Sequence, residues 1–147
     1  MVMKSAIRSL LLISGLVVSL IAFPNPVKAA VAVIVHPENP VVLDAAQVKN
    51  IFLGKMLVFP DGTPAVPLDQ QSGSEIRAVF VRDVLRRDEG SLNAYWARML
   101  FSSKGRPPEV IDSVSELKKR VASNRNAIAY IDVSEVDSSV KVVFTVK

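Results

Sequence analysis

The sequence predicts an α/β domain in which a mixed sheet is flanked by helices. Residues 30–35 (AVAVIV) are apolar and mostly β-branched, which is typical of a strand buried on both faces. Segments with helical spacing of apolar residues follow, interspersed with short extended segments. Strands that alternate with helices along a chain indicate a layered α/β domain.

Further extended segments are expected at residues 56–59, 65–68, 127–131 and 140–146. The sequence PDGT between the first two predicts a turn, because proline and glycine occupy favoured turn positions. The sequence SSKGRPP, residues 102–108, predicts a loop before the last helix.

The expected helices begin at polar residues that can cap a helix N-terminus, namely Asp44, Ser74, Ser91 and Ser113. The first and last of these caps are followed three residues later by Gln47 and Glu116, the spacing of a capping box. Gly54 is expected to end the first helix.

The apolar residues of the second and third helices indicate which faces are buried. In the second helix they are Ile76, Val79, Phe80 and Leu85, which leaves Arg77, Arg82 and Arg86 on the outward face. In the third helix we expect Tyr95, Trp96 and Met99 in the core, with a partner-binding surface as the alternative.

The start of the chain has the features of an export signal. Lys4 and Arg8 precede the apolar residues 10–23, and small residues follow at a position that suits signal peptidase. The apolar run of about 14 residues is shorter than the roughly 20 that span a bilayer. We therefore expect residues 1–29 to be a signal peptide, with a retained anchor as the alternative. Residues 30–147 would form one periplasmic or otherwise exported domain.

Removal of that segment leaves a nearly neutral domain. The chain has 18 Lys and Arg residues and 14 Asp and Glu residues, and three of the basic residues precede residue 30. The high pI of the whole chain is therefore no argument for nucleic-acid binding. The chain has no cysteine, which excludes disulfides, thiol catalysis and thiolate metal sites.

The stretch DQQSGSEIR, residues 69–77, is the candidate ligand site. It lies between an expected strand and an expected helix, whose free N–H groups and partial positive charge can bind an anion. The expected ligand-binding residues are Gln70, Gln71, Ser72, Gly73, Ser74 and Arg77. The alternative is a purely structural role, in which a serine caps the helix and the glycine makes the turn.

Other chemistry has little support in the sequence. His36 is the only histidine, and no partner cluster suggests that it binds a metal. A Ser-His-Asp arrangement of Ser72 or Ser74 with His36 and Asp69 has no support from spacing. Lys104 and Arg106 are expected in a solvated loop. We therefore expect no catalytic residues, no metal and no cofactor, and a protein that is not an enzyme.

Several stretches resemble the phosphate-type periplasmic substrate-binding proteins of ABC transporters. The stretch LDAAQVKNIFLGKMLVFPDGTPAVPLDQQSGS is similar to a second-lobe segment of that family, and residues 51–55 (IFLGK) are its most specific part. NRNAIAYID resembles a strand near the end of the same lobe, and AYWARMLFSSKGRPPE resembles the middle of short, stand-alone members. The resemblance implies one lobe of a type 2 periplasmic-binding-protein fold.

The resemblance also implies a ligand and shows where this chain departs from the family. Ser72, Gly73 and Ser74 match the hydroxyl and amide donors of the family's Ser-Gly-Thr loop. Leu68 stands where the family has its phosphate-binding Arg, and Gln70 stands at the Asp that accepts the phosphate proton. Asn126 and Ala129 replace glycines of the second motif, and Gln71 replaces the first glycine of the loop.

Two functions follow as expectations. The first is an exported substrate-binding protein that binds phosphate or a similar oxyanion and serves an ABC transporter permease. The second is a periplasmic interaction or adaptor module on a degenerate half of the scaffold, whose partner is another protein or a second copy of itself.

Overall fold

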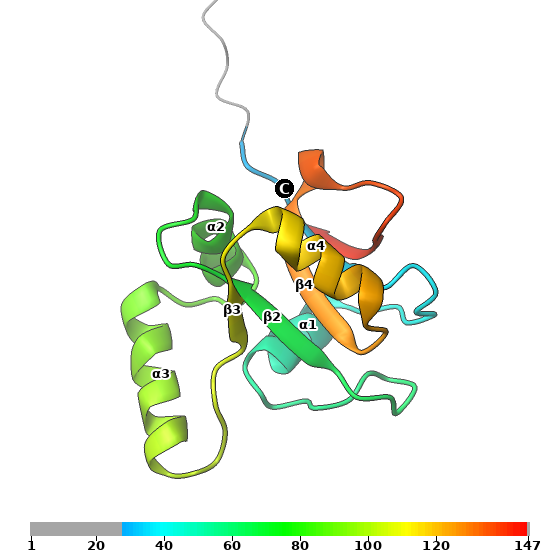
Figure 1. Ribbon diagram of the computed structural model, residues 1–147. Helices are drawn as coiled ribbons and strands as arrows, with labels where there is room; N and C mark the ends of the chain where they lie inside the picture. Colours follow the sequence, from blue (N-terminus) through cyan, green and yellow to red (C-terminus); the bar gives the residue numbers. More distant parts are fainter. Residues whose placement is uncertain (1–27, 147) are drawn as a thin grey trace, which may run out of the picture.

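The computed structural model describes residues 28–146 (Figure 1). The expected signal peptide falls almost entirely outside these residues, so that expectation stays a prediction. Among the described helices, none combines the length and the apolar character that a membrane crossing requires.

The core of the fold is a mixed sheet of five strands, in the order β3-β2-β4-β1-β5. The strands are β1 (Val31–Val35), β2 (Val66–Gln70), β3 (Glu109–Ile111), β4 (Ala127–Asp132) and β5 (Lys141–Val146). β2 pairs in parallel with β3 and β4, whereas β1 pairs antiparallel with β4 and β5. Every residue of β1 is buried, which confirms the prediction of a strand covered on both faces.

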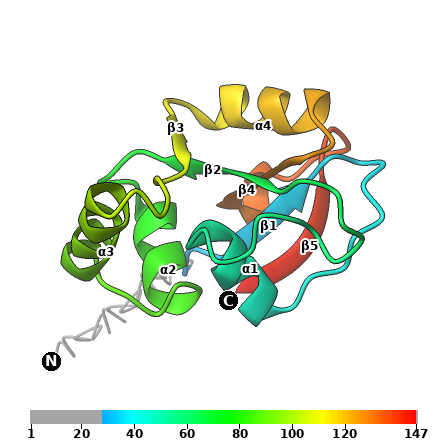
Figure 2. The ribbon, with the colours of Figure 1, turned by 90° about the horizontal axis from the view of Figure 1, so that it is seen from below.

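Helices cover both faces of the sheet, as expected for a layered α/β domain (Figure 2). The helices are α1 (Ala45–Phe52), α2 (Glu75–Asp83), α3 (Glu89–Phe101) and α4 (Val114–Ser123). α4 packs on one face through Leu117 and Val121. The other three helices lie against the opposite face and contribute to the larger core cluster.

Aromatic packing joins this larger cluster to the sheet. The ring of Phe80 on α2 stacks on Tyr130 of β4 with 3.8 Å between ring centroids, and Phe52 of α1 meets both rings edge-on. Trp96 on α3 is buried against Gly54. Gly54 follows the end of α1 and has a positive φ of 66°. Tyr95 and Met99 are partly buried against the same core, so the predicted core role of this part of α3 is confirmed.

Helix starts agree with the sequence prediction at three of the four expected positions. Asp44 forms a complete capping box with Gln47, while Ser74 and Ser113 cap α2 and α4. The expected cap at Ser91 is wrong, because Asp88 caps α3 and accepts the N–H of Ser91 at 2.7 Å. α3 therefore begins at Glu89, which brings the carboxylate of Glu89 close to α2.

The segment at residues 56–59, expected to be extended, belongs to no strand and takes part in an isolated bridge between Val58 and Pro64. Two further expectations need correction. β3 was not expected, and it forms the edge of the sheet beside β2. Arg77 was placed on the outward face of α2 but is only 8% exposed, because acidic partners surround its guanidinium.

Candidate functional site

The stretch at residues 69–77 lies where β2 ends and α2 begins, at the carboxyl end of that strand (Figure 1). β3 runs parallel to β2, with Gln70 paired to Ile111, so the carboxyl ends of both strands lie at the same end of the sheet. α4 begins directly after β3, capped by Ser113. The N-termini of two helices are thus brought to the same place.

A surface pocket of about 360 Å³ lies between these two helix starts. It is lined by Gln70, Gln71, Ser72, Gly73, Ser74, Ile111, Asp112, Ser113 and Val114. In open α/β sheets, ligands bind beyond the carboxyl ends of the strands. The pocket therefore occupies the position in which such a fold holds its ligand.

The loop presents hydrogen-bond donors to this pocket. Gly73 has a positive φ of 93°, which favours glycine and gives the turn into α2. Within the described chain, no acceptor contacts the backbone N–H of Ser72 or Gly73. The helix dipoles of α2 and α4 add partial positive charge at the same end of the sheet.

Charged side chains around the pocket are few. Asp112 is the one ionisable residue that lines it, and its carboxylate accepts a hydrogen bond of 2.7 Å from the amide of Gln71. The described residues place no Lys or Arg side chain in the lining. An anion in this pocket would therefore be held by backbone N–H groups and hydroxyls, beside one carboxylate.

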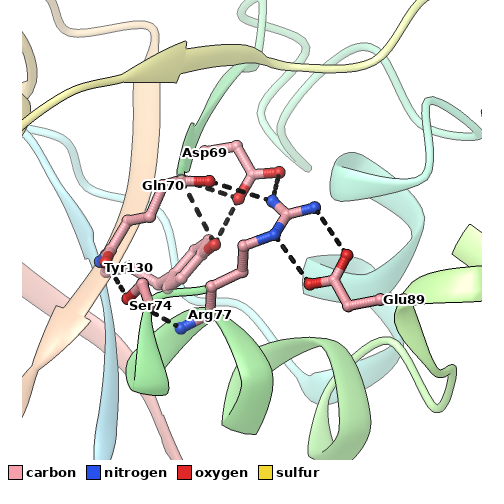
Figure 3. A network of polar contacts seen from close by, with 6 residues as sticks. All are labelled: Asp69, Gln70, Ser74, Arg77, Glu89 and Tyr130. Carbon is pink, nitrogen blue, oxygen red and sulfur yellow. Dashed lines mark hydrogen bonds and ion pairs between the residues drawn. The ribbon is translucent and has the colours of Figure 1, made fainter. Parts of the chain in front are cut away.

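Arg77 lies behind the loop in a polar network (Figure 3). Its guanidinium donates to both carboxylate oxygens of Glu89, at 2.9 and 3.3 Å, and to the carboxylate of Asp69. It also donates to the carbonyl oxygen of Gln70 at 3.1 Å. Burial alone would lower the pKa of Arg77, but the hydrogen bonds to Asp69 and Glu89 outweigh it and raise that pKa. The guanidinium is therefore held as a cation.

The same network fixes Gln70 and Ser74 (Figure 3). The amide of Gln70 donates to the carbonyl oxygen of Tyr130 at 2.8 Å, and the hydroxyl of Ser74 donates to the Gln70 amide oxygen at 2.8 Å. The phenol of Tyr130 donates to Asp69. Burial raises the pKa of Tyr130, and the nearby carboxylate of Asp69 raises it further. These bonds hold the last residue of β2 and the cap of α2 in one arrangement.

Five of the six residues expected to bind a ligand come together in the pocket lining. They are Gln70, Gln71, Ser72, Gly73 and Ser74. Arg77 is the exception, because its guanidinium is committed to Asp69 and Glu89 instead of lining the pocket.

The opposite wall of the pocket, residues 111–114, was not expected from the sequence. The cap at Ser113 was recognised, but the strand before it was not. Without β3, nothing indicated that Asp112 and Ser113 lie beside the loop after β2. Pairing of β3 with β2 is what brings them there.

The remaining candidates take structural positions. His36 accepts the backbone N–H of Glu38 at 3.1 Å through Nδ1, in the turn after β1. Across residues 28–146, no group of three or more histidine and acidic side chains is arranged to hold a metal ion.

Neither a comparison with protein-family models nor one with curated proteins gives a match. Solved structures do match. A structure described as a phosphate ABC transporter substrate-binding protein with bound phosphate, from Clostridium perfringens, matches with a TM-score of 0.60 and 28% identity. The match covers 79% of this chain and 45% of that one.

A second solved structure, an ABC-type phosphate transport receptor from Vibrio cholerae, matches with a TM-score of 0.61 and 21% identity. That match covers 79% of this chain and 46% of the receptor. The chain thus spans less than half the length of these solved proteins. It resembles the phosphate ABC transporter substrate-binding proteins and has the fold of a single lobe of them.

Proposed function

We propose that this chain is an exported, non-enzymic binding protein that takes phosphate or a similar oxyanion in the pocket between α2 and α4. The observation that carries the proposal is the convergence of two helix N-termini, capped by Ser74 and Ser113, on one pocket. The similarity to a solved substrate-binding protein that contains phosphate supports the choice of ligand. Service to an ABC transporter permease is part of the same proposal.

The proposed donors are the backbone N–H groups of Ser72 and Gly73 and the hydroxyl of Ser72. The hydroxyl of Ser74 already donates to Gln70, and its N–H donates to the carbonyl of Gln71. Such groups are neutral, so the attraction for an anion comes from hydrogen bonds and from the helix dipoles rather than from a cationic side chain. Gln71 adds amide hydrogens, one of which is already bonded to Asp112. The Asp112 carboxylate favours an oxyanion that carries a hydroxyl, because it can accept that hydrogen bond.

In this proposal Arg77 positions the loop instead of touching the anion. Its contact with the carbonyl of Gln70 and its ion pair with Asp69 fix both residues that lead into the loop. Arg77 was expected to bind the ligand directly. In this proposal it acts on the ligand site only through Asp69 and Gln70.

Titration calorimetry of the folded protein at low salt tests the proposal. Phosphate, sulfate and an organic phosphate are each added, and one of them is expected to bind with micromolar or tighter affinity. The absence of heat with all three, for protein that is folded by circular dichroism, would contradict the proposal.

A second candidate function is a protein-interaction module, with a homodimer as one form of it. It is favoured by the coverage of the matches, because the chain aligns with less than half of each solved relative. A second hollow, lined by Glu75 and Val133 among others, adjoins the start of β1 and the end of β4. Sedimentation velocity over a range of concentrations tests this candidate, and a monomer at every concentration would rule out the homodimer.

A further inference from the structure

The end of α3 and the loop after it form an exposed tip, defined here as Arg98, Leu100, Phe101, Lys104 and Arg106. Phe101 is 95% exposed and Leu100 is 55% exposed, whereas Trp96 on the same helix is buried. Figure 1 shows this end of α3 protruding from the domain, away from α2. α3 has 13 residues and is therefore about 20 Å long, which separates the tip from the candidate pocket.

The tip is held in a defined shape by backbone hydrogen bonds. The N–H of Ser103 donates to the carbonyl of Leu100 at 3.1 Å, and that of Lys104 donates to the carbonyl of Met99 at 2.9 Å. A Cβ added at Gly105 would lie 3.1 Å from the end of the Met99 side chain, so the loop packs closely against α3. The exposure of Phe101 is therefore a property of an ordered turn.

The charges of the tip are all of one sign. Arg98, Lys104 and Arg106 are exposed, and none of them takes part in an ion pair within residues 28–146. The sequence contains no Asp or Glu from residue 90 to residue 108. The next acidic residue, Glu109, is paired with Arg120 at 2.6 Å.

We infer that this tip docks the protein on an anionic lipid surface. Apolar side chains that lie at the level of the headgroups, surrounded by Lys and Arg, are the combination that binds peripheral proteins to such surfaces. Phe101 and Leu100 supply the apolar part, and the three cations supply the attraction to lipid phosphates. Docking in this way directs the candidate pocket away from the lipid.

Other occupants fit the tip less well. An interface with a second copy around a two-fold axis would bring together the cations of both copies, which repel each other. A protein partner would have to offer both a pocket for Phe101 and acidic groups for three cations, whereas an anionic lipid surface offers an apolar layer and phosphates together. The neighbouring pocket is lined by Arg106 and Pro107 but by neither of these apolar side chains.

The absence of cysteine from the chain allows a test by a single fluorescent label. Ser102→Cys places an environment-sensitive label in the tip, and Ser115→Cys places the same label on α4, which covers the opposite face of the sheet. Each labelled full chain is titrated with vesicles of phosphatidylcholine alone and with vesicles of phosphatidylcholine and phosphatidylglycerol in equal parts. Because the apolar residues 10–23 are present in both chains, the comparison isolates the tip.

We expect the label at residue 102 to shift to shorter wavelength with the anionic vesicles only, and the label at residue 115 to stay unchanged. Phe101→Ser should weaken the response about tenfold, since it removes most of the apolar contact. Replacement of the three cations by glutamine should weaken it by roughly fivefold for each residue, or about a hundredfold together.

The matched control replaces Lys49, Arg86 and Lys119, which lie outside the tip, by glutamine. This control changes the net charge equally and should leave the response nearly unchanged. An equal loss in the control, an equal response to neutral vesicles, or no response at residue 102 would each overturn the inference. The last of these outcomes would leave an acidic protein surface as the partner of the tip. The readout at residue 102 does not depend on anion binding at the pocket.

Discussion

The guanidinium of Arg77 on α2 forms a bidentate ion pair with the carboxylate of Glu89 on α3, with Nε and Nη2 donating to its two oxygens at 2.9 and 3.3 Å. The pair ties the start of α2 to the start of α3. A third donor, Nη1, reaches back to Asp69 and to the carbonyl of Gln70 at the end of β2. One buried cation thus joins two helices and a strand behind the candidate pocket.

Arg77→Ala should destabilise the domain strongly. It leaves the carboxylate of Asp69, which is 15% exposed, without its cation, and breaking a buried ion pair from one side costs about 3–5 kcal/mol. Urea unfolding followed by circular dichroism measures the loss.

Arg82→Ala is the matched control on the same helix. Arg82 pairs with Asp83, but its side chain is 61% exposed, so the expected loss is below about 1 kcal/mol. Equal losses for the two variants would show that the Arg77 network does not stabilise the fold.

Local sequence signals were sufficient to predict most of the helices and strands. The apolar run of β1 and the caps at Asp44, Ser74 and Ser113 depend on neighbouring residues, and the structure confirms them. β3 was missed because three residues are too few to show a period, and two of its three residues are exposed. Its place in the sheet comes from pairing with β2, about forty residues earlier in the chain.

The burial of Arg77 could not be predicted from α2 alone. Arginine is rarely buried without a partner, and its two acidic partners lie on other elements. Glu89 lies in the first turn of α3, within reach of Arg77, because Asp88 and not Ser91 caps that helix. The wrong helix start and the wrong placement of Arg77 are therefore connected.

Ser72→Ala should weaken phosphate binding without loss of stability. The hydroxyl of Ser72 has no partner within the described residues, so its removal leaves the fold intact. A hydrogen bond to a charged ligand contributes about 1.5–3 kcal/mol, which corresponds to roughly a ten- to hundredfold weaker Kd. Calorimetric titration with phosphate measures the change.

Ser115→Ala, on the exposed face of α4, is the control and should bind as the wild type does. Ser74→Ala should behave differently from both, since the cap of α2 is worth about 1 kcal/mol of stability. Unchanged phosphate affinity in Ser72→Ala would place the ligand elsewhere.

Asp112→Asn should alter the selectivity between oxyanions. The asparagine oxygen can still accept the amide of Gln71, while the negative charge in the pocket is removed. Sulfate, which carries no proton at neutral pH, should bind at least about fivefold more tightly, because even a water-screened unit charge at contact distance costs about 1 kcal/mol. Phosphate should gain less, since it also loses an acceptor for its hydroxyl.

Glu116→Gln removes the same charge from the first turn of α4 but does not change the pocket lining. It should leave the ratio of sulfate to phosphate affinity unaltered. A sulfate affinity that does not increase in Asp112→Asn would mean that this carboxylate is not next to the bound anion.

Tyr130→Phe should make the domain less sensitive to alkaline pH. Burial raises the pKa of Tyr130 above its ordinary value of about 10, so the folded state keeps its phenol proton when the unfolded state loses it. The contribution of this group to stability is therefore complete below about pH 10 and declines as the pH rises further. At neutral pH the variant should be less stable by about 1–3 kcal/mol, because the Asp69 carboxylate loses a buried donor. Urea unfolding of both proteins between pH 7 and about pH 11 should show this difference narrowing above about pH 10. A constant difference across that range would mean that the Tyr130 phenol ionises equally easily in the folded and unfolded states.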